Sequence, residues 1–246
     1  MSIVIITGSG GLVGAESVKF FSKKFSKVIG IDNNMRAYFF GKNGSVKKNI
    51  ISLKKNVKNY THHNIDIRNL SKIKKIFKKY RSKTKFIIHS AAQPSHDWAV
   101  NGPLIDYSVN STGTLNILES FRIFCPNAKL AYLSTNKVYG DRPNFLPLEE
   151  KKERYELKKN NKYHKKGIDE NMSVDNCTHS LFGASKLSAD IYSQEYLKYF
   201  NLKIGIFRGG CLTGPLHQGA ELHGFLNYLI KAAKEKKTYK IFGYKG

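Results

Sequence analysis

The sequence predicts an α/β fold, a doubly wound parallel sheet with helices on both faces. Short runs rich in β-branched residues alternate with segments of helical period, and parallel strands need helical crossovers between them. The first run leads into a glycine-rich turn, as in folds of this class. The expected strands are 3–8, 27–32, 60–67, 85–90, 129–135, 203–209 and 239–244.

The helices between these strands follow from the spacing of apolar residues. Segment 70–80 places its apolar side chains on one stripe and its lysines opposite, which is the spacing of an amphipathic helix. Similar helices are expected at about 12–26, 107–124 and 183–200. Residues 141–178 form a polar connection rich in lysine and asparagine. A connection of this length inside a compact domain is expected to be functional or mobile.

The composition predicts a globular chain in a reducing compartment. Its 246 residues are 41% hydrophobic, enough for a substantial core. No apolar run of about eighteen residues occurs and no basic leader precedes the first strand, so we expect no membrane partner and a cytoplasmic location. Cys125, Cys177 and Cys211 are odd in number and lack the spacing of metal ligands, so we expect free thiols and no metal site.

The formal net charge of +24 has two interpretations. It can mark a polyanion-binding surface, or it can reflect lysines scattered over every solvated helix face. The lysines occur in separate segments, at 19–27, 72–83, 151–166 and 231–237. A nucleic-acid footprint should gather on one face and accompany a known motif. We therefore expect no nucleic-acid partner, and charge-driven nucleic-acid binding is the outside alternative.

The segment TGSGGLVG (7–14) follows the first strand and opens a helix, the context of a Rossmann-type dinucleotide site. Gly8 permits the tight turn, Gly11 lets the backbone approach a pyrophosphate, and Gly14 lets helix and strand pack closely. The helix amino terminus then offers unpaired N–H groups to the phosphates.

Asp32 ends the second strand and supports the same interpretation. Its carboxylate can accept hydrogen bonds from the hydroxyls of an adenosine ribose and would repel a 2′-phosphate, which favours NAD over NADP. Arg36 lies close in sequence and keeps NADP open as an alternative.

Several motifs occur in the same order as in one known family. They are TGSGGLVG, the strand-end Asp32, Asp66-Ile67-Arg68, His89-Ser90-Ala91-Ala92 and Phe182-x-x-x-Lys186. With these motifs the chain resembles the extended short-chain dehydrogenases/reductases, which are NAD-dependent nucleotide-sugar epimerases and dehydratases. The segment STNKVYG (134–140) is most similar to the branch of CDP-paratose 2-epimerases.

The resemblance implies a set of site residues. Asp66 and Ile67 would hold adenine, Asn110 would support the active site, and Thr135 would bond the sugar hydroxyl that is oxidised. Lys186 would bind the nicotinamide ribose. The implied cofactor-binding residues are Gly8, Gly10, Gly11, Leu12, Val13, Gly14, Asp32, Asn33, Arg36, Asp66, Ile67, Ala91, Ala92, Gln93, Asn110, Ser134, Lys186 and Gly209. The implied catalytic positions are Thr135, Lys137, Phe182 and Lys186.

Phe182 departs from the family pattern, because family members carry a tyrosine at this place that takes the hydroxyl proton. Phenylalanine cannot ionise, and loss of a general base typically costs about 10² to 10⁴ in rate. Another group can act as base, the chain can perform different chemistry on a related sugar, or it can bind NAD and sugar nucleotide without turnover. The candidate bases are Lys137, Lys186, His96, His179, Cys211 and Thr135, the last through a water.

The expected reaction is epimerisation of a nucleotide-diphosphate sugar, with C2 of a CDP-sugar as the position that the resemblance implies. Dehydratases carry an Asp-Glu pair after the catalytic Thr, whereas this chain has Asn136 and Lys137. The alternatives are a catalytically silent NAD and nucleotide-sugar binding protein, and a related dehydratase or reductase. The resemblance also implies a role in carbohydrate and lipopolysaccharide biosynthesis, and a homodimer formed through helices 107–124 and 183–200.

The expected domain organisation has two parts. Residues 1–210 form an NAD-binding Rossmann domain with the polar insertion 141–178, and residues 211–246 form a partial substrate-binding lobe. Because 239–244 reads as a strand with nothing after it to cover it, we expect the lobe to be truncated. The lysine-rich part of the insertion, 151–166, is either a lid over a diphosphate or a solvated loop. Segment 214–225, with His217 and His223, is expected to be a loop of the substrate lobe.

Overall fold

The computed structural model describes residues 1–220 and 223–239, and its centre is a parallel sheet. The six strands have the order β3-β2-β1-β4-β5-β8, and every neighbouring pair is parallel. This confirms the predicted α/β, doubly wound fold. The strands are β1 (Ile3–Thr7), β2 (Lys27–Ile31), β3 (Tyr60–His63), β4 (Thr84–His89), β5 (Lys129–Thr135) and β8 (Lys203–Gly209).

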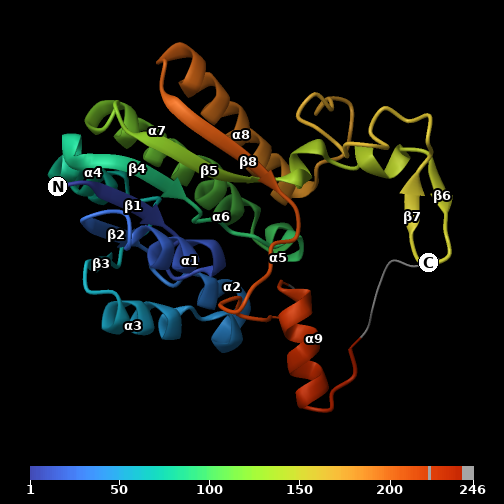
Figure 1. Ribbon diagram of the computed structural model, residues 1–246, viewed down its shortest axis with the longest axis horizontal. Helices are drawn as coiled ribbons and strands as arrows, with labels where there is room; N and C mark the ends of the chain where they lie inside the picture. Colours follow the sequence, from blue (N-terminus) through green and yellow to red (C-terminus); the bar gives the residue numbers. More distant parts are fainter. Residues whose placement is uncertain (221–222, 240–246) are drawn as a thin grey trace.

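Helices cover both faces of the sheet, as Figure 1 shows with α7 and α8 above it and α1 and α3 below. Alternate residues of β1 pack into the cores on the two faces of the sheet, because successive side chains of a strand point to opposite faces. Ile3 and Ile5 belong to the core under the first layer, and Val4 and Ile6 to the core under the second. The first layer consists of α4 (Leu70–Tyr80), α7 (Gly113–Phe124) and α8 (Ser180–Tyr199), and the second of α1 (Leu12–Phe21) and α3 (Lys47–Asn56).

The predicted helices are present, with shifted ends in most cases. The helix predicted at 70–80 matches α4, whose apolar stripe is buried through Ile73, Ile76, Phe77 and Tyr80. The helix predicted at 12–26 ends earlier, at Phe21. The helix predicted at 107–124 begins earlier, because α6 (Pro103–Tyr107) and a π-helical turn (Ser108–Thr112) lead into α7.

Several elements were not predicted. They are α2 (Arg36–Gly44), α3, α5 (His96–Asn101), α9 (Phe225–Lys234), and the short turns Arg81–Lys83, Asn136–Tyr139 and Arg142–Phe145. The α2 segment shows why, since it breaks at Phe40 and Gly41, where Gly41 has a φ of +64°. A helix interrupted in this way has no continuous apolar stripe to recognise.

The polar connection 141–178 has a small core of its own and stands beyond the carboxyl ends of the strands (Figure 1). Its strands β6 (Leu148–Glu150) and β7 (Tyr155–Leu157) form an antiparallel hairpin. Tyr163 and Met172 are buried against Val138 and Tyr139 of the preceding turn. The connection is therefore packed onto the end of β5.

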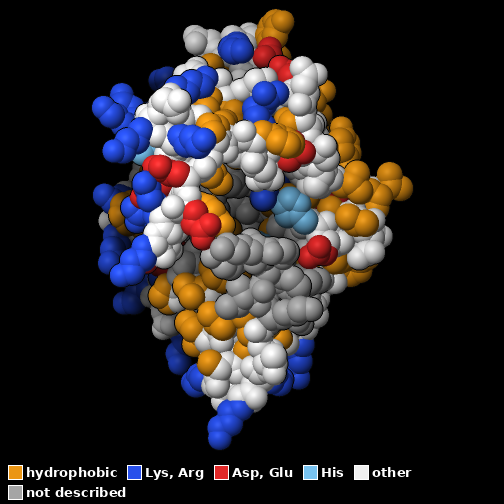
Figure 2. Space-filling model, turned by 90° about the vertical axis from the view of Figure 1, so that its right-hand side faces the viewer, with side chains coloured by type: hydrophobic (Ala, Val, Ile, Leu, Met, Phe, Trp, Pro, Cys, Tyr) orange, Lys and Arg blue, Asp and Glu red, His pale blue; other side chains and the backbone are white. Residues whose placement is uncertain are grey.

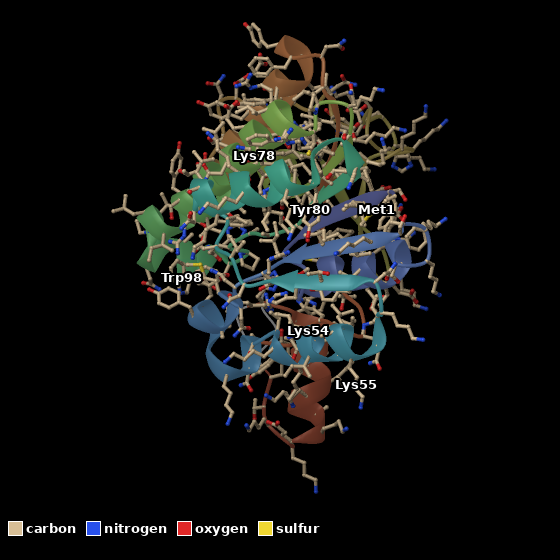
Figure 3. All side chains as sticks on the ribbon, turned by 90° about the vertical axis from the view of Figure 1, so that its left-hand side faces the viewer. Met1, Lys54, Lys55, Lys78, Tyr80 and Trp98 are labelled. Carbon is tan, nitrogen blue, oxygen red and sulfur yellow. The ribbon has the colours of Figure 1, made fainter. Side chains whose placement is uncertain are left out.

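Basic side chains lie on separate elements of the described chain. Figure 3 shows Lys78 of α4 on one side of the sheet and Lys54 and Lys55 of α3 on the other. In the described part of the chain, none of the helices has the length and apolar character needed to cross a membrane. Most of the expected strand 239–244 lies outside the described residues, so it stays a prediction, as does the division at residue 210.

Candidate cofactor and substrate site

A cavity of about 510 Å³ opens at the carboxyl ends of the strands, on the face that Figure 2 shows hollowed. The strand order reverses beside β1, and such a switch point is where doubly wound sheets bind ligands. Most of the predicted site residues line this cavity. They are Gly8, Gly11, Leu12, Val13, Gly14, Asp32, Asn33, Arg36, Asp66, Ile67, Ala91, Ala92, Ser134, Thr135, Lys137, Phe182, Lys186 and Gly209.

Two glycines of the segment TGSGGLVG, one in the loop after β1 and one in the first turns of α1, leave no room for a Cβ atom. Gly8 has a φ of +67°, and a Cβ there would lie 2.7 Å from the nitrogen of Ala91. A Cβ on Gly14 would lie 2.0 Å from the oxygen of Gly8. The first turn of α1 carries no acidic side chain, and its N-cap Gly11 offers no capping group. Its N–H groups and positive dipole end are therefore available to a diphosphate.

Asp32 is held at the rim of this loop by two backbone N–H groups. Gly10 donates to Oδ2 at 2.9 Å and Asn34 donates to Oδ1 at 2.7 Å. Burial raises the pKa of Asp32, and these two hydrogen bonds offset part of the rise. Each carboxylate oxygen keeps a second lone pair for the hydroxyls of a ribose. Gly10 does not line the cavity and acts through Asp32.

Arg36 makes hydrogen bonds within the protein. Its Nη2 donates to the carbonyl of Gln218 at 2.9 Å, and its Nη1 lies 3.2 Å from Nδ1 of His223. Burial lowers the pKa of Arg36 to about 10, so the group stays cationic at neutral pH. The guanidinium therefore holds Gln218 and His223 near Asp32, and His217 and His223 form part of the cavity wall.

Asn49 of α3 holds Leu216 against the glycine loop, and this role was not predicted. Its Nδ2 donates to the carbonyl of Gly10 at 2.9 Å and to that of Leu216 at 3.2 Å. A lone asparagine on a surface helix carries no motif, so no local signal could have identified this role.

Asp66 lies at the far wall of the adenosine end, after β3. Its carboxylate accepts hydrogen bonds from Arg68, with 2.6 Å between Nη2 and Oδ2. Burial raises the pKa of Asp66, but the hydrogen bonds from Arg68 outweigh this effect and lower it overall. Ile67 lines the cavity beside it, and its contact with adenine stays a prediction.

Lys186 of α8 occupies the opposite end of the cavity. Its Nζ donates to the carbonyl of Leu133 at 2.9 Å and lies 4.6 Å from the ring centroid of Tyr132. Burial lowers the pKa of Lys186 to about 8, while attraction to Asp190 and Asp106 opposes the decrease. At neutral pH the lysine is mainly an ammonium, held at the end of β5 next to Ser134 and Thr135.

A buried ionic network behind Lys186 was not predicted. Asp190, fully buried on α8, accepts hydrogen bonds from Arg208 of β8 and from Ser134 of β5. Arg208 also donates to the hydroxyl of Tyr139 at 3.2 Å. The network connects α8 with β5 and β8. It therefore fixes the position of α8, and with it that of Lys186, relative to the sheet.

Gln93 and Asn110 do not line the cavity, although both were predicted to belong to the site. Gln93 donates to Asp106 at 2.7 Å, and Asn110 donates to Asp106 at 3.0 Å and to Ser185 at 3.1 Å. All four side chains are buried. They support α8 from behind. The expected support of the active site by Asn110 stays a prediction.

His89 supports the same region from β4. Its ring nitrogens lie 2.6 Å from Oγ1 of Thr7 and 2.9 Å from Oγ1 of Thr114. Burial lowers the pKa of His89 to about 3, with Lys186 adding to the decrease. The imidazole is therefore neutral, and both of its nitrogens are occupied.

Phe182 and Thr135 face the cavity at the Lys186 end. Phe182 is 6% exposed, and its ring centroid lies 4.8 Å from that of His96. Oγ1 of Thr135 accepts the backbone N–H of Lys137 at 3.2 Å. Among the described residues no tyrosine lines the cavity. No other phenol there can therefore replace the one that the family pattern has at position 182.

The other candidate bases separate by position. His96, Lys137, Thr135 and Cys211 line the cavity, whereas His179 does not. His179 instead places Nε2 2.8 Å from the carbonyl of Val174. No described residue of the connection 141–178 lines the cavity, and the described residues contain no cluster of His, Cys, Asp and Glu that could hold a metal ion.

Comparison with known proteins agrees with this geometry. Residues 4–168 match the model of the NAD dependent epimerase/dehydratase family. The chain is 30% identical over 236 residues to CDP-paratose 2-epimerase of Salmonella typhi, covering 96% of this chain and 64% of that protein. It is 27% identical over 245 residues to UDP-glucuronate 4-epimerase of Thermodesulfobacterium geofontis, covering 99% of this chain and 65% of the relative. The chain therefore spans less than two thirds of the length of either relative.

Solved structures share the fold. UDP-glucose 4-epimerase of Thermotoga maritima, solved with UDP-glucose, superposes with a TM-score of 0.71 at 20% identity, over 98% of this chain and 66% of that one. A tyrosine-to-phenylalanine mutant of UDP-glucuronic acid 4-epimerase from Bacillus cereus, in complex with UDP-4-deoxy-4-fluoro-glucuronic acid and NAD, superposes with a TM-score of 0.73 at 23% identity, over the same shares. The chain belongs to the NAD-dependent epimerase/dehydratase family of extended short-chain dehydrogenases/reductases, and its cofactor is NAD.

Proposed function

We propose that this protein epimerises a nucleotide-diphosphate sugar by transient oxidation and re-reduction, and that C2 of a CDP-sugar is the position changed. One observation carries the proposal. A single cavity joins the glycine loop and Asp32 at one end with Thr135 and Lys186 at the other. Similarity to CDP-paratose 2-epimerase over 96% of the chain supports the choice of sugar position.

The residues of the cavity fit NAD along its length. The N–H groups of α1 would bind the diphosphate, and Asp32 would accept the adenosine ribose hydroxyls. Asp66 and Ile67 would hold adenine, and Lys186 would bind the nicotinamide ribose. When bound, NAD supplies the acceptor and later the donor of the hydride on the sugar carbon.

Epimerisation is favoured over dehydration by the residues after Thr135. Dehydration needs an acid to expel a hydroxyl and a base to remove a carbon-bound proton. Asn136 and Lys137 follow Thr135, and neither is a carboxyl group. Thr135 lines the cavity and would hydrogen-bond the sugar hydroxyl that is oxidised.

A catalytically silent NAD and nucleotide-sugar binding protein is the second candidate function. Phe182 favours it, because the position offers no proton acceptor. The two functions agree on both ligands and differ only in turnover.

The remaining assignments are part of the proposal. Residues 1–210 would form the NAD-binding domain in the cytoplasm, and 211–246 part of the substrate lobe. A homodimer through α7 and α8 is supported by exposed apolar side chains on one of them. These are Ile191, Tyr192 and Tyr199 of α8, which are 44%, 46% and 78% exposed.

Turnover in D₂O tests the function. Purified protein with NAD is incubated with CDP-paratose, and the product is followed by ¹H NMR. We expect interconversion of C2 epimers without deuterium at C2, because the hydride that leaves the carbon returns to it. Glu16→Gln, on the exposed side of α1, is the matched control and should behave as wild type.

Deuterium at C2 would contradict redox epimerisation. Binding of NAD and CDP-paratose without turnover would establish the silent binding protein. A protein that binds neither ligand by calorimetry would overturn both functions.

A further inference from the structure

The end of the cavity that holds Phe182 also holds one imidazole that the family pattern does not use. His96 is the first residue of α5, and α5 packs against α8, the helix that carries Phe182 and Lys186. The rings of His96 and Phe182 lie 4.8 Å apart between centroids, and both side chains line the cavity together with Thr135. The imidazole therefore borders the place where a phenol of residue 182 would act.

Ser180 orients this imidazole. Its Oγ lies 3.0 Å from Nδ1 of His96 and accepts the backbone N–H of Gly183 at 3.2 Å. A serine oxygen has two lone pairs, so the second can accept Nδ1–H. That arrangement leaves the lone pair of Nε2 free.

The backbone conformation of Ser180 indicates that its contact with His96 is imposed by the surrounding structure. Ser180 has a φ of +60°, in the left-handed region that residues other than glycine rarely adopt. Such a conformation persists where the surroundings determine it, and it clusters at functional sites. Here it places the hydroxyl of Ser180 between α5 and the first turn of α8.

The other groups at this end are less suited to accept a proton. Lys186 is mainly protonated at neutral pH and already donates to Leu133. Lys137 is exposed, and Cys211 is an exposed thiol in the segment after β8. His217 and His223 lie beside Arg36, at the adenosine end.

The surroundings keep His96 neutral. Burial lowers its pKa, and Lys137 lowers it further, while Asp97 opposes the decrease. Lys137 acts from the turn after β5 and Asp97 from α5 itself. A neutral imidazole can accept a proton at pH 7, as a general base must.

We propose that Nε2 of His96 is the proton acceptor that replaces the missing phenol. The sugar O–H bond breaks and its proton forms an N–H bond on Nε2, while the electron pair of the O–H bond becomes the second bond of the carbonyl. The hydride lost from the carbon goes to NAD, the oxidant of the proposed function on which this inference rests. In the return step Nε2 gives the proton back to the sugar oxygen.

The first test reads the imidazole directly and needs no turnover. The ¹H–¹⁵N signals of His96 are identified in NAD-loaded protein by their absence from His96→Gln, and their titration is followed with and without CDP-paratose. We expect CDP-paratose to shift the pKa of His96 and the signal of Nε2. An unchanged titration with bound sugar nucleotide would overturn the proposal, even if the protein proved to be a silent binder.

The second test uses hydride transfer in a single turnover. His96→Gln should lose about 10² to 10⁴ in rate, and the decrease of the wild-type rate at acid pH should disappear with it. Ser180→Ala should keep that pH limb but lower the rate less, as a positioning residue would. His179→Gln is the control, because this histidine does not line the cavity.

The outcomes separate the two proposals. A wild type that turns over while His96→Gln keeps both the rate and the pH limb would overturn the role of His96 and leave epimerisation standing. A wild-type protein that binds NAD and CDP-paratose without turnover would overturn epimerisation. The titration of His96 with and without CDP-paratose would then show whether its imidazole contacts the sugar.

Discussion

Asp190 and Arg208 form a buried ion pair behind the Lys186 end of the cavity, with 2.9 Å between Oδ1 and Nη2. The side chain of Asp190 is 0% exposed and that of Arg208 is 12% exposed. Because Ser134 also donates to Asp190, this carboxylate connects β5, which ends at Thr135, with the helix that carries Lys186.

Asp190→Ala should lower the free energy of unfolding by about 3 to 5 kcal/mol, because it leaves the guanidinium of Arg208 buried without its partner. Denaturant titration measures the loss. Glu195→Ala removes the partner of Lys198 in an exposed pair on the same helix and should cost much less. Equal losses in the two variants would show that Asp190 contributes no more than a surface charge.

This pair also illustrates what the sequence could not predict. Asp190 and Arg208 lie on different elements, and no local spacing relates them. The glycine loop and Asp32 could be predicted because a tight turn, a helix amino terminus and a strand end have short-range patterns. The helix 70–80 could be predicted because its apolar stripe is continuous.

The role of Asn49 could not be predicted from the sequence. Its contacts with Gly10 and Leu216 depend on how α3 lies over the glycine loop, which is tertiary information. Gln93 belongs with it, since a residue next to a motif was expected in the cavity but turned inward toward Asp106.

Asp32→Asn should weaken NAD binding by about 10- to 100-fold, because hydrogen bonds to a charged acceptor contribute about 1.5 to 3 kcal/mol. The same change removes the charge that repels a 2′-phosphate, so the preference for NAD over NADP should shrink. Calorimetry with both dinucleotides measures the two affinities. Glu16→Gln, at an exposed side chain of α1 that does not line the cavity, should leave both unchanged. An unaltered NAD affinity in Asp32→Asn would contradict the ribose contact.

Gly14→Ala should destabilise the protein by about 1 to 3 kcal/mol or more, because the new Cβ would lie 2.0 Å from the oxygen of Gly8. The melting temperature and NAD affinity should fall together, since the proposed diphosphate site includes the displaced loop. Gly210→Ala is the matched control for stability, because a Cβ there meets no atom within 4 Å. Normal NAD affinity in Gly14→Ala would show that the loop does not hold the cofactor.

Lys186 should make stability depend on pH in the alkaline range. Its pKa is lowered from 10.5 to about 8, so between these values the unfolded chain binds more protons than the folded protein. Stability from this group therefore rises with pH over that window and is constant below it. Lys186→Met should remove the rise. Denaturant midpoints from pH 7 to 10 measure it, and parallel curves for wild type and variant would contradict the buried, low-pKa lysine.

Phe182→Tyr tests whether the ring or the imidazole limits proton transfer. If His96 is the acceptor, a new phenol in the wild type changes the rate of hydride transfer little, because the proton already has a destination. In the His96→Gln background the same substitution should restore at least about tenfold in rate, since a phenol beside the Lys186 ammonium can then take the proton. Single-turnover formation of reduced nicotinamide measures both backgrounds. A large increase in the rate of hydride transfer from Phe182→Tyr in the wild type would mean that His96 does not serve as the base. The wild-type rate would then be the residual rate of an enzyme without a general base.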